Sequence, residues 1–362
     1  MEGPITCHLD FAREWRGGQR QVCLLAAGLA QRGLRTLAVT RRGSPLAERL
    51  AGTGVEVIFL RVWGEFDWPA ARRVAGIARE AGAEILAAHA SHPHSIALLA
   101  RGGLPNAKIV VHRRVDVPIG HSRKKYLAPD AYIAISEAVR RELLAGGVPG
   151  NKIHLVSSGV PPHVRDDQAK ARLAKAWHLD PAAPWVGCVA DLVDHKGHEF
   201  LLRAWRLVWQ TEPAARLVII GDGPLRASLE ALARQLGVSE QVRFVGRSND
   251  VPAWLSALSV FALTSKTEGL GSSILDAMAA RVPVVATAAG GIPELVRHEQ
   301  TGLLAPVGDV EAIAANVTIA LRDRQKAEAL SNAAYNEVWR TRSADAMVEN
   351  TLRAYREILS RQ

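Results

Sequence analysis

The sequence predicts an α/β protein of two domains, each built on a parallel β-sheet with helices on both faces. Two observations lead to this fold class. Short apolar stretches alternate with longer stretches of helical periodicity along the whole chain. The 362 residues also exceed what one hydrophobic core usually organises. A composition of 48% hydrophobic and 22% charged residues is typical of an ordinary soluble globular protein.

The first half contains the pattern of a complete domain. A helix expected over 17–33 has Val22, Leu25 and Leu29 on one face. The polar, turn-rich stretch 157–168 is the best candidate for a linker that ends this half. Strands are expected over 5–11, 34–40, 55–60, 83–89, 108–114, 131–136 and 152–158.

The second half repeats the alternation and ends in a helix. A stretch over 344–360 has apolar residues at helical spacing and follows a complete second domain. Strands are expected over 185–191, 216–222, 242–246, 260–265 and 282–287.

Charge is distributed unevenly between the two halves. The chain carries a net charge of +9, and this whole excess lies in residues 1–160, whereas residues 161–362 are balanced. The bias indicates an acidic partner for the first half: anionic lipid, phosphorylated glycan or nucleic acid. Cys7, Cys23 and Cys188 are widely spaced, which favours reduced thiols in a cytosolic protein. We expect neither a signal peptide nor a membrane span.

A nicotinamide-binding dehydrogenase is one alternative for such a chain. Its fingerprint, G-x-G-x-x-G, lies between the first strand and the first helix. Here that turn reads EWRGGQRQ, and the GDGPLR stretch at 221–226 lacks the third glycine. The sequence therefore disfavours this alternative.

Two glycine-rich turns lie where an expected strand gives way to a helix. Gly17-Gly18 is in the first half and Gly269-Leu270-Gly271 is in the second. Glycine lets a ligand approach the backbone, and the N–H groups at a helix start attract phosphate. Either turn could be purely structural, but a matched pair favours a ligand held between the domains.

Two carboxylates, Glu268 and Asp276, flank the second turn, with seven residues between them. If the backbone amides hold a diphosphate, these acids would repel it unless they faced its hydroxyl-bearing ends. A ribose diol on one side and a sugar on the other would each donate hydrogen bonds to a carboxylate. The pattern thus fits a nucleotide sugar. An ordinary loop acid and an ordinary helix acid would give the same spacing.

These residues carry a resemblance to a known family. The stretch SKTEGLGSSILDAMAARVPVVATAAGGIPELV (265–296), with GCVADLVDHKGHEFLLRAW (187–205) and LVIIGDGPLRASLEALARQLG (217–237), resembles glycosyltransferase family four. The resemblance covers residues 187–320 and extends more loosely through the first half, at EWRGGQRQ and EILAAHASHPHS.

That family consists of retaining sugar transferases with the GT-B fold, two Rossmann-like domains facing each other across a cleft. The resemblance implies an acceptor-binding domain over 1–158 and a nucleotide-sugar-binding domain over 159–343. The C-terminal helix, over 344–362, would pack back on the first domain.

The resemblance also implies roles for individual residues. Glu268 would contact the transferred sugar, and Asp276, where the family usually has Glu, would hold the ribose diol. Lys196 would neutralise the departing diphosphate, Gly18 would offer a loop amide near the same phosphates, and His89 would lie beside the donor sugar. The expected catalytic residues are Lys196, Glu268 and His89. The expected donor site comprises Gly17, Gly18, Lys196, Glu268, Gly269, Leu270, Gly271 and Asp276.

One departure from the family pattern concerns the leaving group. The family often has an arginine six residues before the lysine, and here that position is Ala190. Either Lys196 and the amides suffice for the diphosphate, or Arg16 or Arg20 beside Gly18 supplies the missing cation.

No metal is expected. His89, His92 and His94 have a spacing that suits no common zinc site, and no acid is close to them in sequence.

The expected reaction is transfer of a hexosyl unit from a nucleoside diphosphate sugar, with UDP as the favoured nucleotide, and with retention of anomeric configuration. The nucleotide sugar is a co-substrate, and no cofactor is needed. Two alternatives stay open: a GT-B nucleotide-sugar epimerase and a catalytically silent nucleotide-sugar-binding protein.

The basic stretch 111–126 suggests where the acceptor binds. Its cations are Arg113, Arg114, Arg123, Lys124 and Lys125, opposed by a single acid. A nucleotide-sugar site gives nucleic acid no role, so an anionic glycan or glycolipid, such as lipopolysaccharide core, explains the charge better. We therefore expect a cytoplasmic monomer, peripheral on the inner face of the cytoplasmic membrane.

Overall fold

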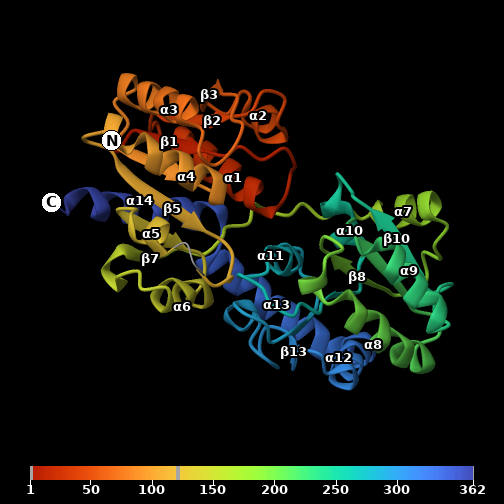
Figure 1. Ribbon diagram of the computed structural model, residues 1–362. Coiled ribbons are helices and arrows are strands. Elements are labelled where there is room, and N and C mark those ends of the chain that lie inside the picture. The colour runs from red at the N-terminus through yellow and green to blue at the C-terminus, as the bar shows by residue number, and fades with distance from the viewer. Residues whose placement is uncertain (1–2, 120–122, 362) are drawn as a thin grey trace. The chain divides into compact units, whose positions relative to one another are not determined.

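The computed structural model describes residues 3–119 and 123–361 and divides into two compact units (Figure 1). Unit 1 is Met1–Pro161 together with Arg342–Gln362, and unit 2 is Pro162–Thr341. None of the helices in the described part of the chain combines the length and the apolar character that a membrane crossing requires.

Unit 1 contains a seven-stranded sheet in the order β3-β2-β1-β4-β5-β6-β7, with parallel pairing throughout. Every residue of β1, β4 and β6 is buried, because helices cover both faces of the sheet. Its strands are β1 (Thr6–Leu9), β2 (Thr36–Thr40), β3 (Glu56–Phe59), β4 (Ile85–Ala88), β5 (Lys108–Arg113), β6 (Ala131–Ala134) and β7 (Ile153–Leu155).

The helices of unit 1 include one from the far end of the chain. They are α1 (Gly17–Gln31), α2 (Pro45–Leu50), α3 (Trp68–Glu80), α4 (Ser91–Ala100), α5 (Arg123–Leu127), α6 (Glu137–Ala145) and α14 (Ala344–Ser360).

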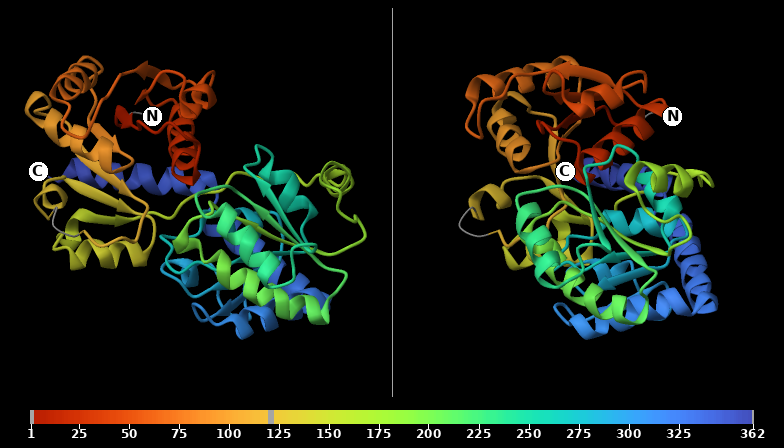
Figure 2. Two further views of the ribbon diagram at one scale, coloured as in Figure 1. Left: turned by 45° about the vertical axis from the view of Figure 1, so that its right-hand side comes forward. Right: turned by 90° about the vertical axis from the view of Figure 1, so that its right-hand side faces the viewer.

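The C-terminal helix α14 is an integral part of unit 1. Its first turn is capped by Ser343, whose hydroxyl accepts a hydrogen bond from the Ala346 amide. Its apolar face joins the core formed with α1 and β5, and it runs beside β5 in Figures 1 and 2. Gly28 of α1 allows this close packing, since a Cβ there would lie 2.6 Å from Val348.

Unit 2 contains a six-stranded parallel sheet in the order β10-β9-β8-β11-β12-β13. Its strands are β8 (Trp185–Val189), β9 (Arg216–Ile220), β10 (Val242–Gly246), β11 (Val260–Leu263), β12 (Val284–Thr287) and β13 (Leu303–Ala305). Its helices are α7 (Ala169–Trp177), α8 (His198–Thr211), α9 (Arg226–Gln235), α10 (Val251–Ala257), α11 (Ser272–Ala279), α12 (Val310–Arg322) and α13 (Arg324–Thr341).

The core of unit 2 is rich in large side chains. Trp185, Trp205 and Trp254 are fully buried, which anchors the helices on the sheet. Only the three-residue strand β13 falls outside the stretches that the sequence predicts as strands in this unit. Both units are Rossmann-like, so the predicted α/β fold class is confirmed.

Candidate functional site

The predicted donor residues of unit 2 lie at the edge of its sheet where the strands end. Lys196 follows β8 in a single 3₁₀ turn, Asp194–Lys196, and Glu268 follows the neighbouring strand β11. The chain runs from β8 to β9 on one side, while β11 lies on the other side of β8. Such a switch point is where open α/β sheets bind ligands, because the loops after the two strands diverge there.

Lys196 and Glu268 form an ion pair. The Lys196 Nζ donates to Glu268 Oε2, and the Ser265 hydroxyl lies 3.4 Å from the same oxygen. The two side chains are 20% and 13% exposed. Separating the two side chains would leave each charge poorly solvated, so the pair holds both groups in place.

The loops that carry this pair are joined to each other. The Lys266 amide donates to His195 O at 2.7 Å, and the Thr264 hydroxyl donates to Gly197 O at 2.9 Å. Gly197 has a φ of 61°, and a Cβ there would lie 2.0 Å from Thr264 O. Only glycine fits this position, so the HKG sequence at 195–197 is explained by the approach of the two loops.

The glycine turn before α11 is also held from a third strand. Gly271 has a φ of 94° and precedes the first helical residue, Ser272. The Gly291 amide, after β12, donates to Glu268 O at 2.8 Å. A Cβ on Gly291 would lie 2.4 Å from Gly269 O. Backbone at a helix start is thus fixed beside the ion pair, in an arrangement suited to phosphate.

Asp276 is half-buried on α11, one turn from the helix start. Its charge acts on His163, a residue that the sequence reasoning missed. The pKa of His163 is lowered, because burial outweighs the opposing effect of the Asp276 carboxylate. The His163 Nε2 lies 3.1 Å from the Ser256 hydroxyl. No local motif marks His163 in the sequence, because it lies in the polar stretch before α7.

The predicted donor residues of unit 1 begin helix α1. Gly17 is its first residue, and the preceding Arg16 makes no capping bond with its side chain. A Cβ on Gly18 would have no heavy atom within 4 Å, so this turn is open. The nearby Asp10 carboxylate accepts from the Ala12 amide and from Gln19 Nε2, and burial raises the pKa of Asp10.

His89 lies in a buried stack of three imidazoles. Its ring centroid is 5.1 Å from that of His8 and 4.4 Å from that of His112. Arg114 Nη1 lies 3.2 Å from His89 Nδ1 and can only donate, so His89 Nε2 carries the proton and donates to His8 Nδ1 at 2.9 Å. Both ring nitrogens of His89 are therefore used inside unit 1. Its role beside a donor sugar stays a prediction.

The stack is uncharged near neutral pH. Burial lowers the pKa of His8 to about 3 and the pKa of His89 and His112 well below the usual value, with nearby Arg114 adding to all three effects. His112 Nε2 lies 2.7 Å from the Tyr355 hydroxyl of α14. The stack thus ties β1, β4 and β5 to the C-terminal helix.

The basic stretch 111–126 is divided by the fold. Arg113 is buried, donates to the Tyr126 hydroxyl at 3.1 Å and stacks on that ring. Arg114 is the partner of His89. Lys125 Nζ lies 3.3 Å from Glu65 and donates to the Ser91 hydroxyl.

Arg123 and Lys124, on α5, are exposed. Of the five predicted cations, these two are therefore the ones whose side chains are exposed, as contact with an acceptor or a membrane requires.

The histidines after β4 do not converge on a common point. His92 Nε2 lies 2.7 Å from Gly64 O, whereas His94 packs edge-on against Tyr126 and Tyr132. Across residues 3–119 and 123–361, no group of three or more potential ligands is placed to hold a metal ion.

The chain matches two family models, one in each half. Residues 15–164 match the model described as Glycosyltransferase Family 4, and residues 170–337 match the model described as Glycosyl transferases group 1.

Named relatives agree with these matches. A GDP-mannose-dependent alpha-(1-6)-phosphatidylinositol monomannoside mannosyltransferase of Mycobacterium tuberculosis is 31% identical over 331 residues, which cover 85% of this chain and 82% of the relative. The lipopolysaccharide core biosynthesis mannosyltransferase LpsB of Rhizobium meliloti is 31% identical over 192 residues, covering 51% and 54%.

A solved structure supports the fold. The crystal structure of HepE from Anabaena in complex with UDP and glucose has a TM-score of 0.85 at 20% identity, covering 97% of this chain and 99% of that one. The two family matches and the mycobacterial relative, which is matched over most of both chains, agree with the Rossmann-like units and the loops after β8 and β11. The chain belongs to glycosyltransferase family 4 and is a GT-B glycosyltransferase that uses a nucleotide sugar.

Proposed function

We propose that this protein is a retaining hexosyltransferase that transfers a sugar to an anionic glycan or glycolipid of the cell envelope. The observation that carries the proposal is the Lys196–Glu268 ion pair at the switch point of the unit 2 sheet. It joins a cation suited to a diphosphate and a carboxylate suited to sugar hydroxyls, beside the glycine turn that begins α11.

The proposed chemistry is electrostatic. The bond between the anomeric carbon and the diphosphate oxygen breaks, and the acceptor oxygen bonds to that carbon on the same face. The acceptor proton passes to the departing diphosphate. Lys196 and the backbone amides near Gly269 stabilise the charge that develops on the leaving group, and Glu268 positions the sugar. We propose no metal in this step.

The nucleotide is the first property to measure. The sequence predicts a UDP sugar, and the HepE structure contains UDP, but a likeness at 20% identity supports the fold alone. The mycobacterial relative is named for GDP-mannose and is 31% identical over most of both chains. A GDP sugar is therefore the better supported donor, and UDP sugars are its direct competitors in the test.

The acceptor class rests on charge. The excess of positive charge lies in residues 1–160. Of the two relatives described above, one is named for a phosphatidylinositol mannoside and one for lipopolysaccharide core. An envelope glycolipid such as lipopolysaccharide core, reached from the inner face of the cytoplasmic membrane, fits both observations.

The proposal is tested with a panel of GDP, UDP and ADP sugars. Release of nucleotide with and without phosphorylated or lipid-linked glycans measures hydrolysis and transfer, and proton NMR of the product gives its anomeric configuration. A product with inverted configuration would contradict retention. Conversion of one nucleotide sugar to another would identify an epimerase, and binding without turnover of any donor would indicate a silent binding protein.

A further inference from the structure

A cavity of about 560 Å³ opens in unit 1. Its side chains come from the loop after β1, the loop after β2 and the segment after β3. Because β1, β2 and β3 are adjacent and parallel, these segments lie along one edge of the sheet. The lining residues are Arg13, Arg41, Arg42, Gly43, Ser44, Phe59, Leu60 and Arg61. We call this cavity the arginine pocket.

The arginine pocket has four guanidinium groups in its lining and no carboxylate. Acids close by in the sequence are engaged elsewhere. The Asp10 carboxylate accepts from Ala12 and Gln19, Glu14 pairs with Arg16, and Glu56 pairs with Arg35. Four like charges around one cavity repel each other, and an anion inside it would relieve that repulsion.

Arg41 is held in a fixed orientation. Its Nε donates to Phe11 O at 2.9 Å and its Nη2 donates to Val62 O at 2.6 Å. These bonds use two of the five N–H donors of a guanidinium group, so three stay available to a ligand. Burial lowers the pKa of Arg41, and the nearby charge of Arg13 lowers it further.

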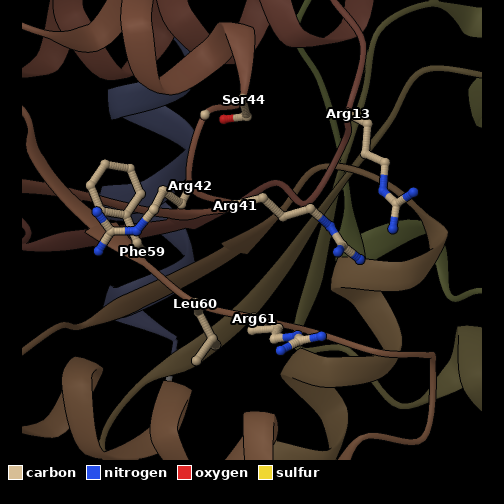
Figure 3. A pocket seen from close by; sticks show the side chains of 8 residues that line it. Arg13, Arg41, Arg42, Ser44, Phe59, Leu60 and Arg61 are labelled. Atoms are coloured by element: carbon tan, nitrogen blue, oxygen red, sulfur yellow. The ribbon is translucent and has the colours of Figure 1, made fainter.

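Aromatic rings accompany the other two arginines. The Arg42 Cζ lies 4.9 Å from the centroid of the Phe59 ring, and the Arg61 Cζ lies 3.7 Å from that of Trp63. Trp63 is 75% exposed. In Figure 3, the guanidinium groups of Arg13, Arg41 and Arg61 lie on the same side of the view, and Arg42 lies against Phe59. The pocket therefore has three guanidinium groups on one side, and on the other side a fourth that lies against an aromatic ring.

We propose that the arginine pocket binds the phosphate group of a phosphorylated saccharide. This inference rests on the proposed function, because it assigns the pocket to the acceptor. A phosphomonoester offers close to two charges and three acceptor oxygens, which match several guanidinium groups better than a single carboxylate does. The volume exceeds what a lone phosphate needs and lies in the range of small-molecule sites.

The test is calorimetry on the full-length protein with glucose 6-phosphate, and with glucose as the uncharged probe. The pocket variant is Arg13→Gln/Arg61→Gln, because both side chains are exposed. Arg41 is left unchanged, because it donates hydrogen bonds to backbone carbonyls. The matched control is Arg72→Gln/Arg79→Gln, which removes two exposed charges from α3 of the same unit.

Glucose 6-phosphate should bind the wild type and the control variant with equal affinity. It should bind the pocket variant at least tenfold more weakly, since two charge-assisted contacts are lost. Glucose should bind none of them measurably. Equal weakening in both variants would show a general charge effect and overturn the proposal. The proposal is also overturned if the pocket variant binds glucose 6-phosphate as tightly as the wild type does. It is overturned as well if the wild type does not bind glucose 6-phosphate at millimolar concentration.

A second experiment, with phosphatidylglycerol vesicles, distinguishes a lipid head group from a soluble saccharide as the source of the phosphate. Loss of both vesicle binding and glucose 6-phosphate binding in the pocket variant would support a lipid head group as the source. Loss of glucose 6-phosphate binding with vesicle binding retained would support a soluble or core saccharide. The wild type could hydrolyse no donor and still bind glucose 6-phosphate more tightly than the pocket variant does. In that case the proposed function fails and the phosphate site stands.

Discussion

The ammonium group of Lys196 and the carboxylate of Glu268 reach each other from loops that follow different strands. Because of this contact, a single substitution at either position affects both catalysis and stability. Removing Lys196 also leaves the largely buried Glu268 carboxylate without its cation, which costs stability on its own account. A variant that removes both charges separates the catalytic effect from this local cost.

We predict that Lys196→Ala lowers turnover more than it weakens donor binding, because a group that stabilises the departing diphosphate acts mainly in the transition state. Steady-state kinetics and donor calorimetry measure the two effects. Lys196→Ala/Glu268→Gln should remain poorly active. Lys266→Ala is the control, since Lys266 follows β11 as Glu268 does and pairs with Asp194, after β8, and Glu199 of α8. Equal losses in turnover and binding would assign Lys196 to ground-state binding only.

For Asp276, the prediction concerns affinity. Replacing Asp276 with Ala should weaken donor binding by about 1.5–3 kcal/mol, tenfold or more, because one charge-assisted hydrogen-bonding group is lost. Asp276→Glu should retain most of the affinity, since it keeps the carboxylate. Calorimetry with uridine, guanosine and adenosine diphosphates gives both values. An unchanged affinity of Asp276→Ala for the best ligand would remove the ribose role.

At the scale of elements, the sequence was informative where one local pattern decides the outcome. Apolar runs such as 185–191 and 260–265 predicted β8 and β11, because strands buried on both faces are apolar without interruption. The glycine turn at 269–271 and the start of α11 at Ser272 were predictable from glycine followed by helical spacing. The three residues of β13 are too short to show such a pattern.

Contacts that depend on strand register could not be predicted in this way. His8, His89 and His112 lie far apart in sequence and meet because β4 pairs with both β1 and β5. His8 is opposite Ala87, so His89, two residues later, has its side chain on the same face. The arginine pocket likewise needs the order β3-β2-β1, and its cations are spread over three segments.

The histidine stack predicts a dependence of stability on pH. An imidazole in the unfolded chain titrates near pH 6.5, whereas His8 in the fold has a pKa of about 3. The unfolded state therefore binds more protons between these values, so the free energy of unfolding should fall as the pH drops below about 6.5. Stability conferred by the neutral stack is fully present above that pH.

Urea unfolding between pH 7.5 and 5, followed by circular dichroism, measures this dependence. His112→Phe removes one of the titrating rings and should reduce the slope of the unfolding free energy against pH. His195→Gln changes an exposed histidine and should leave the slope as in the wild type. If His112→Phe and the wild type have the same slope, the stack does not control acid sensitivity.

At the scale of the whole molecule, the basic residues of the positively charged first half are of two kinds, buried and exposed. Arg113 is buried and serves the internal structure of unit 1, whereas Arg123 and Lys124 on α5 are exposed. The net charge of +9 therefore overstates the charge available to a partner. A membrane surface responds only to the exposed cations.

Vesicle co-sedimentation tests the resulting membrane prediction. The wild type should bind vesicles containing phosphatidylglycerol, should ignore neutral vesicles, and should dissociate as salt is added, because surface charges are screened. Arg123→Ala/Lys124→Ala should lose about 2 kcal/mol of binding free energy, since each cation near a charged surface contributes about 1 kcal/mol. Arg353→Ala/Arg356→Ala, two exposed arginines of α14 in the same unit, is the matched control and should bind nearly as the wild type does. If the wild type ignores anionic vesicles at low salt, a soluble acceptor replaces the membrane-bound one.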